Sequence, residues 1–401
     1  MNKWLKFTML YIGAVVVGLS QLKITPIIKP LAEQLQVNMT QMSLLTSVFT
    51  ISGIFIAIPG GILVSRYGAK KLLLIVMSCL VLGNVLGILS KSFSLLLVSR
   101  AIEGISFSTI VMIAVVLIND WFKDSHYSGT AIGIFTTFPA TASLIGMNLF
   151  LPLSNRFGIF ASSYLLAGLG IFLVISYFFL IEEPITEKQE EAVVGINVLK
   201  EAAQNKTVWV LGILQGVMAF VLYSYIALYP LLFTDYYSLP VSQANFYASL
   251  FGLFGIPFGV IAGMLIDKMK NRGLIFIAAY GMMLAACLAA PYLAGSQVAF
   301  ILQILFLSVS ASLASSSVTI MVPNVVREER LLSVSLSIVN IFYYSCIVIG
   351  APLVAAIIEK MSWPIGLLLL ASVACIGLVA SFVLTKQFNQ SIGGIRNEQN
   401  I

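Results

Sequence analysis

The sequence predicts an all-α membrane protein with twelve transmembrane helices in two six-helix repeats. Hydrophobic residues make up 59% of the 401 residues and charged residues only 9%. The mean hydropathy of +1.01 lies outside the usual range of soluble globular proteins. Twelve apolar runs reach the roughly 20 residues that a helix needs to cross a bilayer. They begin near residues 5, 41, 72, 95, 128, 159, 207, 241, 274, 297, 331 and 363.

The first run follows Lys3 and Lys6, and so has the basic start of a signal peptide. No small-residue cleavage site follows this run, and eleven further apolar runs do. We therefore expect it to be the first transmembrane helix.

The basic residues are unevenly distributed between alternate connectors. If the N-terminus is cytoplasmic, sixteen of the 22 lysines and arginines fall in cytoplasmic segments. This bias follows the positive-inside rule and predicts a multi-pass protein of the cell membrane with both termini in the cytoplasm. The net charge of +6 thus reflects membrane topology. We expect the protein to lie in a lipid bilayer and not to bind nucleic acid.

The longest polar break runs from Glu183 to Lys206. It predicts an N-terminal six-helix bundle over residues 1–182, a cytoplasmic linker over 183–206 and a C-terminal bundle over 207–401. A folded domain usually needs about 50 residues or more, so the linker has no room for a soluble catalytic or output domain. Because the common hydrolase, metalloprotease and phosphate-loop motifs are also absent from the sequence, neither an enzyme nor a sensor is expected.

The four cysteines occur singly inside apolar runs. This spacing predicts neither a disulfide framework nor a metal site. We interpret the cysteines as small core residues. We expect no metal and no cofactor.

The two halves repeat each other at an offset of 202 to 204 residues. The clearest match is a set of small residues spaced four apart, Gly53, Ala57 and Gly61 in the second span and Gly255, Gly259 and Gly263 in the eighth. Small side chains on one helix face let a neighbouring backbone approach closely. Two parallel six-helix repeats with a binding site between them at the midplane are a known transporter plan.

The connector "GGILVSRYGAKK" (Gly60–Lys71) resembles a signature of major facilitator superfamily transporters, roughly G-x-L-a-D-r-x-G-r-[RK], between their second and third helices. "SRAIEG" (Ser99–Gly104) resembles a second signature, R-x-x-x-G, in the fourth helix, where the arginine faces the central cavity. With the twelve spans and the linker, the resemblance covers essentially the whole chain. It implies the major facilitator fold and transport by alternating access.

The resemblance also implies a cytoplasmic gate. In the family, the acid of the loop signature is associated with a contact to the positive N-terminal end of a helix in the other half. Ser65 stands in the place of that acid, whereas Asp267 supplies one in the second copy, "AGMLIDKMKNRG". The predicted gating residues are Gly61, Ser65, Arg66, Gly68, Gly263 and Asp267. We expect the gate to be weaker on the Ser65 side by about 0.3 to 1 kcal/mol of helix-dipole interaction.

The subfamily is predicted from further short matches. The fifth span, "AIGIFTTFPATASLIG", lacks the glycine- and proline-rich signature of drug/proton antiporters. By contrast, "RAIEG", "INDWF" and "GTAIGIF" look like the cyanate/nitroimidazole-transporter branch and other uptake carriers of small organic anions. Such a similarity is associational evidence for function.

Three charged residues, Lys23, Arg100 and Glu103, lie clearly within predicted spans. Each would cost about 2.5 to 3.5 kcal/mol if it faced lipid, which favours a water-filled cavity. The first span runs outward and the fourth inward, so Lys23 and Arg100 share a similar depth. The resemblance implies that both helices line the central cavity, where a net charge of +1 would match a small carboxylate. Arg100 is the better anchor, because its guanidinium offers a planar bidentate fork.

Structural interpretations of the same residues remain open. Lys23 could simply extend to the outer interface, and Arg100 and Glu103 could form a pair that only fixes the helix. Glu103 is the sole acid clearly inside a span, and we predict it as the proton carrier. The only histidine, His126, falls in a cytoplasmic turn, so a histidine relay is not expected.

The second half contributes polar and aromatic residues in place of charges. The predicted solute-binding residues there are Tyr223, Gln303, Asn340 and Tyr343, and Gln303 aligns with Arg100 at the repeat offset. We expect the first half to hold the charge and the second half to recognise shape. Tyrosine and asparagine also serve as interhelical hydrogen-bonding residues, which is the structural alternative.

The sequence thus predicts a monomeric secondary transporter that imports a small organic anion, with protons as the coupling ion. The alternative is a proton-coupled carrier that exports drugs or metabolites. Such a carrier needs an acid in an apolar cavity but no buried cation cluster.

Overall fold

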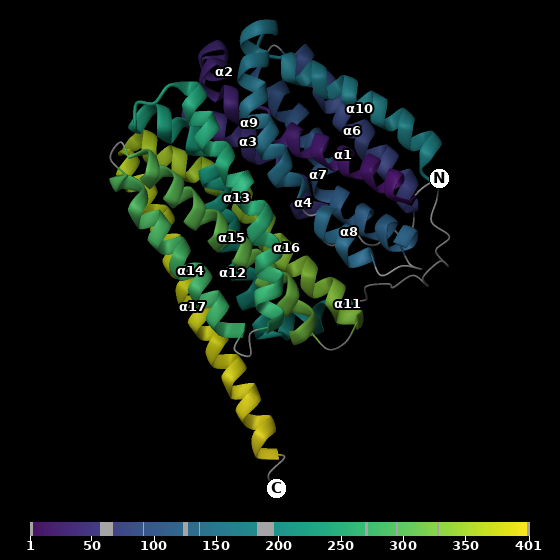
Figure 1. Cartoon of the computed structure of the whole chain (residues 1–401), viewed down its shortest axis with the longest axis vertical. Coiled ribbons are helices and arrows are strands. Elements are labelled where there is room, and N and C mark those ends of the chain that lie inside the picture. The colour runs from purple at the N-terminus through teal and green to yellow at the C-terminus, as the bar shows by residue number, and fades with distance from the viewer. Residues whose placement is uncertain are drawn as a thin grey trace.

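The computed structural model describes residues 3–56, 67–90, 92–122, 127–135, 137–182, 196–268, 272–293, 296–326 and 329–398. Every regular element in these ranges is helical. Figure 1 shows the first half, in purple through blue to teal, beside the second half, in teal through green to yellow, with α2 at one end of the molecule and α8 and α11 toward the other. We call these the α2 end and the α11 end.

The first half contains nine α-helices and two short 3-10 turns among its described residues. They are α1 (Lys3–Leu22), η1 (Thr25–Ile27), α2 (Ile28–Leu35), α3 (Met39–Ser47), η2 (Val48–Thr50), α4 (Ile51–Ile56), α6 (Ala69–Leu89), α7 (Phe93–Phe122), α8 (Ser128–Phe135), α9 (Phe138–Phe157) and α10 (Ala161–Leu180).

The second half begins with a short amphipathic helix and continues with longer ones. The elements are α11 (Ile196–Gln204), α12 (Lys206–Leu231), the π-helical turn η3 (Leu232–Tyr236), α13 (Val241–Lys268), α14 (Arg272–Ala289), η4 (Ala290–Tyr292), α15 (Gln297–Val325), α16 (Glu329–Lys360) and α17 (Trp363–Glu398).

The helices correspond to the predicted spans. Within the described residues, ten helical stretches are long and apolar enough to cross a membrane. The predicted fifth and eighth spans are not among these ten, but both are helical, as α8 followed by α9 and as α13. The predicted all-α architecture is therefore confirmed.

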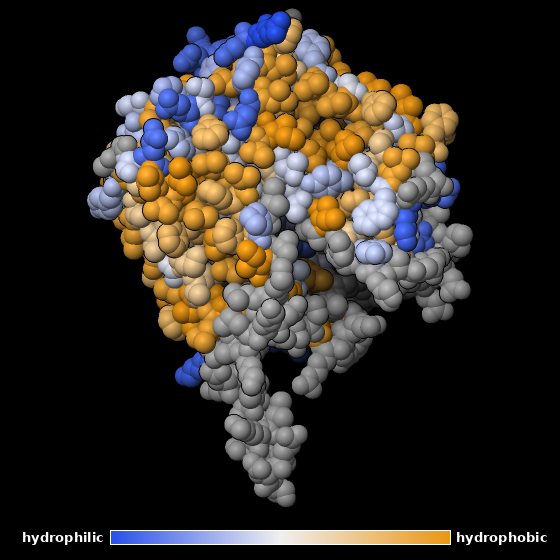
Figure 2. Space-filling view, viewed as in Figure 1, coloured by the Kyte–Doolittle hydropathy of each residue, from blue (hydrophilic) through white to orange (hydrophobic). Residues whose placement is uncertain are grey.

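Large apolar side chains cover much of the outer surface. Figure 2 shows them across both halves on the visible face. On α10, for example, Phe172, Phe178 and Phe179 are 60%, 59% and 77% exposed. Continuous apolar patches of this kind are unfavourable in water, but they suit the hydrocarbon core of a bilayer.

The first predicted span is interrupted. α1 ends at Leu22, and Lys23 and Ile24 form a bend before η1. Pro26 has no N–H group to donate, so the helical hydrogen bond to the Leu22 carbonyl cannot form. The interruption leaves backbone carbonyls near the end of α1 without helical partners, and these need other donors inside the protein.

A glycine contact fixes α7 beside this interruption. A Cβ atom built on Gly104 would overlap the carbonyl oxygen of Phe49 in η2. A Cβ atom built on Gly83 of α6 would likewise overlap the Glu103 side chain and the backbone of α7. The absence of two side chains thus brings α6, α7 and η2 together around Glu103.

The two halves meet at two helix interfaces, α3 and α4 against α16, and α9 against α13. At the α2 end these interfaces include polar contacts. Thr40, in the first turn of α3, donates its backbone N–H and its hydroxyl to the Glu359 carboxylate, at 3.1 and 2.5 Å. Lys29 forms an ion pair with Asp235, and Asn245 Nδ2 donates to the Pro26 carbonyl at 3.0 Å. These contacts close the α2 end.

The end of α10 is tied to α1 near the α11 end. Lys6 Nζ donates to Glu182 Oε2 at 2.7 Å, and this hydrogen bond lowers the pKa of the Glu182 carboxyl. Glu182 is the last described residue before the predicted linker, so the ion pair marks where the chain leaves the first half.

We expect Gly104→Ala to lower the free energy of unfolding by about 1 to 3 kcal/mol, because the new methyl group would overlap backbone that has little room to move. Gly281→Ala in α14 is the matched control, since a Cβ atom there meets nothing within 4 Å. Thermal unfolding of the purified protein in detergent measures both. A Gly104→Ala variant that melts at or above the temperature of the parent would contradict the assigned contact.

Candidate functional site

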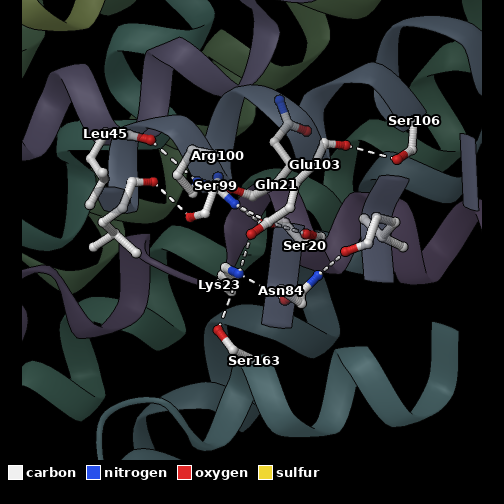
Figure 3. A network of polar contacts seen from close by, with 12 residues as sticks. Ser20, Gln21, Lys23, Leu45, Asn84, Ser99, Arg100, Glu103, Ser106 and Ser163 are labelled. Atoms are coloured by element: carbon white, nitrogen blue, oxygen red, sulfur yellow. Dashed lines mark hydrogen bonds and ion pairs between the residues drawn. The ribbon is translucent and has the colours of Figure 1, made fainter. Parts of the chain in front are cut away.

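The structure brings the three charged residues of the predicted spans into one cluster (Figure 3). Lys23 Nζ lies 2.7 Å from Glu103 Oε1, and Arg100 Nη1 lies 2.8 Å from Glu103 Oε2. The side chains of Arg100 and Glu103 are 0% exposed and that of Lys23 is 3% exposed. We call these three residues the charge cluster. It is buried within the first half.

Lys23 comes from the interruption between α1 and η1, and it joins three other helices. Besides Glu103 on α7, its ammonium donates to Asn84 Oδ1 on α6 at 2.8 Å and to Ser163 Oγ on α10 at 3.2 Å. An ammonium group has three N–H donors, so each has a partner. In this conformation Lys23 points into the bundle and does not extend to a membrane interface.

Arg100 satisfies the carbonyls that the interruption of α1 leaves free. Its Nη1 donates to the Ser20 carbonyl at 2.7 Å and its Nη2 to the Gln21 carbonyl at 2.8 Å. The Nε donates to the Leu45 carbonyl of α3 at 3.3 Å, and the guanidinium carbon lies 4.4 Å from the centre of the Phe49 ring. A cation at the C-terminal end of a helix also interacts favourably with the helix dipole.

Glu103 accepts on both carboxylate oxygens. Oε1 accepts from Lys23, while Oε2 accepts from Arg100 and from the Ser20 hydroxyl at 2.6 Å. Charge-assisted hydrogen bonds of this length are among the stronger ones in proteins. The carboxylate is therefore the common partner of both cations.

The cluster holds two cations and one anion, and its other partners are neutral hydroxyl, amide and carbonyl groups. One positive charge is thus balanced only by dipoles. Burying an ion costs several kcal/mol, and close partners with good geometry offset that cost. All three N–H groups of Lys23 and four of the five of Arg100 have such partners. Among the described residues there is no group of histidine, cysteine or acidic side chains that could hold a metal ion.

A small cavity between the two halves, with a volume of about 20 Å³, lies next to the charge cluster. It has room for about one water molecule in this conformation. Its polar wall residues are Gln21, Thr25, Thr46 and Ser47 from the first half and Tyr223 from the second, and its apolar ones are Leu22, Ile226, Ala227 and Ile347. Gln21 belongs both to this wall and, through its carbonyl, to the hydrogen bonds of Arg100. The cluster is thus directly behind the cavity wall.

Of the predicted second-half residues, two lie together. The hydroxyls of Tyr223 on α12 and Tyr343 on α16 are 2.6 Å apart, and Tyr223 lines the cavity. Gln303 accepts from the Tyr229 hydroxyl at 2.8 Å and is buried within the second half. Asn340 is exposed on α16. The structure does not bring Gln303 together with the tyrosine pair.

The sequence did not predict four polar residues of the cavity wall, Gln21, Thr25, Thr46 and Ser47. A signal for Gln21 was present, because it lies two positions before the charged residue Lys23 and close to the helix-breaking Pro26. Thr46 and Ser47 carry no comparable signal, since hydroxyl residues are common in packed transmembrane helices.

The predicted gating residues lie largely beyond the described structure. Gly61, Ser65 and Arg66 are outside the described residues, and of Gly263 and Asp267 only the helical backbone is described. Gly68 precedes α6 with φ of +83°. That angle favours glycine, so Gly68 has a structural reason for its place in the loop.

Comparison with known proteins identifies the fold. A family model described as Major Facilitator Superfamily matches residues 10–343 and, in a second match, residues 211–394. A bacterial homologue of the human lysosomal transporter Spinster, in an inward-facing and unoccupied conformation, aligns with a TM-score of 0.78 and 15% identity over 97% of this chain and 98% of that one. Its inward-facing, occupied form gives 0.77 and 15% over 96% and 97%.

We expect Glu103→Gln to lower the free energy of unfolding by about 3 to 5 kcal/mol, because it leaves two buried cations without an anion. Lys23→Met should cost less, since Arg100 and Glu103 then remain as a neutral pair. Melting temperatures of the two variants, measured in detergent, show which substitution destabilises the protein more. A Lys23→Met variant that is less stable than Glu103→Gln would show that the unbalanced charge does not dominate the energetics of the cluster.

Proposed function

Because the chain belongs to the major facilitator superfamily, we propose that it imports a small organic anion, most simply a carboxylate, together with protons. The superfamily consists of transporters that work by alternating access, and not of enzymes. The chain is therefore a multi-pass membrane transporter of small molecules. The solute, its direction and the coupling ion are the proposed part.

The observation that carries the proposal is the unbalanced positive charge behind the cavity wall. Arg100 hydrogen-bonds the carbonyl of Gln21, which itself lines the cavity between the halves. A unit charge about 8 Å from an anion contributes about 2 kcal/mol of attraction at an effective dielectric constant of about 20. The cavity is thus expected to favour an anion over a cation of similar shape.

In a conformation that widens this small cavity, its wall offers neutral groups to receive such an anion. Amide and hydroxyl donors come from Gln21, Thr46 and Ser47 in the first half, and a tyrosine hydroxyl comes from Tyr223 in the second. The Tyr343 hydroxyl forms a hydrogen bond with the Tyr223 hydroxyl and so fixes its position. We assign charge attraction to the first half and recognition of shape to the second.

Direct contact of Lys23 and Arg100 with the solute is a further step of the proposal. In this conformation Lys23 and Arg100 donate to side chains and carbonyls of the first half, so direct contact requires the interruption after α1 to open in another state. A discontinuous helix at the midplane is a common place for such a change in transporters. Solute binding by Gln303 and Asn340 stays a prediction.

Glu103 is the proposed proton carrier. Three donors surround its carboxylate here, and withdrawal of Lys23 or Arg100 would free further lone pairs for a proton. The same withdrawal would free a cation for the solute, which links proton uptake to anion binding. This linkage is what a symporter requires.

The proposed topology follows the distribution of basic residues. We assign the α11 end, with both termini, to the cytoplasm and the α2 end to the outside. Residues 1–182 and 207–401 are the proposed bundles, joined by the linker 183–206, in a monomer. The resemblance to the cyanate/nitroimidazole-transporter branch supports the direction of uptake by analogy.

One observation favours the alternative, a carrier that exports drugs or metabolites. Four of the residues that line the cavity, Leu22, Ile226, Ala227 and Ile347, are apolar. An amphipathic cargo would bind to such a surface. The net positive charge of the cluster argues against a cationic cargo.

We expect small carboxylates to raise the melting temperature of the purified protein and lipophilic cations to leave it unchanged. A ligand that binds only the folded state stabilises it by about 2.7 kcal/mol at 100 times its dissociation constant. A thermal-shift screen of carboxylates, inorganic anions and lipophilic cations measures this directly. Stabilisation by lipophilic cations alone would favour the export alternative.

We expect Glu103→Gln to retain solute exchange but to lose accumulation driven by a proton gradient, because the glutamine cannot carry a proton. Proteoliposomes that contain the folded fraction of the variant, assayed below its melting temperature, separate the two activities. Arg100→Gln is the comparison, and it should lose uptake of the anion altogether. Accumulation by Glu103→Gln at the level of the parent would remove Glu103 from the coupling step.

A further inference from the structure

A second and larger cavity lies between the two halves at the α2 end, with a volume of about 180 Å³. It has room for several water molecules, and so for a small solute. We call it the α2 pocket. Its wall includes Ile28, Lys29 and Glu33 of α2, Met42 of α3, and Leu231 and Asp235 of the second half.

The α2 pocket lies in line with the small cavity beside the charge cluster. On three stretches of chain, a residue of the cavity wall and a residue of the pocket wall are three or four positions apart, which is about one helical turn. In each pair the pocket residue is the one nearer the α2 end, so the two spaces are neighbours on one line between the halves. The pairs are Ala227 and Leu231 on α12, Thr46 and Met42 on α3, and Thr25 of η1 and Ile28 of α2.

An ion pair crosses the α2 pocket from one half to the other. Lys29 of α2 pairs with Asp235 of η3, and both residues line the pocket. Their side chains are 41% and 30% exposed, so water can replace either partner and the pair is weak. Glu33, one turn further along α2, adds a second carboxylate to the wall, and it forms no ion pair within the described part of the chain.

Such a wall is complementary to a solute that carries both charges. A zwitterion placed between the two partners gives its carboxylate to Lys29 and its ammonium to Asp235, so every charged group of the pair keeps a partner. A carboxylate alone would take Lys29 and leave Asp235 unpaired beside Glu33. An ammonium alone would pair with a carboxylate and repel Lys29. The zwitterion therefore makes two favourable contacts where either single charge makes one.

We propose that the α2 pocket is a second binding site on the solute route, and that the solute is a small zwitterion of the amino acid type, held between Lys29 and Asp235. The inference rests on the proposed function in one respect: the carboxylate bound in the α2 pocket is the group that the charge cluster attracts in the cavity. There the hydroxyl and amide oxygens of the wall can accept the N–H groups of the ammonium. In the α2 pocket, the solute takes the place of the direct contact between α2 and η3.

Protection of a single cysteine measures binding in the α2 pocket. Ala32→Cys, in a chain whose four native cysteines are serine, places a thiol in the pocket wall. Maleimide labelling of the purified protein is timed with and without alanine, propionate or ethylammonium, which differ in their charged groups. For a dissociation constant of about 1 mM, alanine at about 10 mM should slow labelling about tenfold. Propionate and ethylammonium should slow it about threefold or less, because loss of one ion pair weakens binding about fivefold.

Two variants of the ion pair assign each contact. Asp235→Asn should remove the difference between alanine and propionate, and Lys29→Gln should remove the difference between alanine and ethylammonium. Lys360→Gln is the matched control, because this lysine is exposed at the same end and does not line the pocket, and it should keep both differences. In the parent, protection by propionate or by ethylammonium equal to that by alanine would overturn the proposal, as would no protection by alanine.

A further variant separates the α2 pocket from the cavity. Tyr223→Phe alters the cavity wall and not the pocket wall, so protection by alanine should persist. Its loss in this variant would place alanine in the cavity and overturn the second site.

The second site and the proposed function fail separately. If alanine protects the cysteine as expected but proteoliposomes take up no carboxylate, the second site stands and the proposed import is wrong. If propionate raises the melting temperature of the protein but alanine does not protect the cysteine, the proposed function stands and the zwitterion site is wrong.

Discussion

The contact of Arg100 with the interrupted end of α1 is the interaction on which the rest of the site depends. Without the guanidinium, the carbonyls of Ser20 and Gln21 would lack partners in a region with no bulk water. With it, the first span can bend at Lys23 and send that side chain inward. The same contact fixes Gln21 in the cavity wall, so the residue whose carbonyl Arg100 binds is also one that we propose to meet the solute.

Close backbone packing makes this arrangement possible. Gly83 and Gly104 bring α6, α7 and η2 near enough for Lys23 and Arg100 to share Glu103. The hydrogen bonds and ion pairs of these three residues offset part of the cost of burying them. The price of the arrangement is one unbalanced charge, and that charge is also the property that would attract an anion.

Hydropathy and repeat patterns predict the helices well, because the cost of exposing backbone in lipid leaves few alternatives. The depth argument for Lys23 and Arg100 rests on the same constraint. Whether the charges face the cavity or lie behind its wall depends on helix rotation, which hydropathy does not determine. Asn84 and Ser163, the partners that turn Lys23 inward, stand in the sequence as isolated polar residues with no mark of their role.

The closure of the α2 end has a consequence for turnover. Lys29 and Glu359 belong to contacts at the surface, where single ion pairs and hydrogen bonds contribute about 1 kcal/mol or less. In the proposed transport cycle, these surface contacts and the buried Asn245–Pro26 hydrogen bond must all break when the α2 end opens. Because added salt weakens surface ion pairs, the Lys29–Asp235 contact is expected to hold the α2 end less firmly in a saline medium.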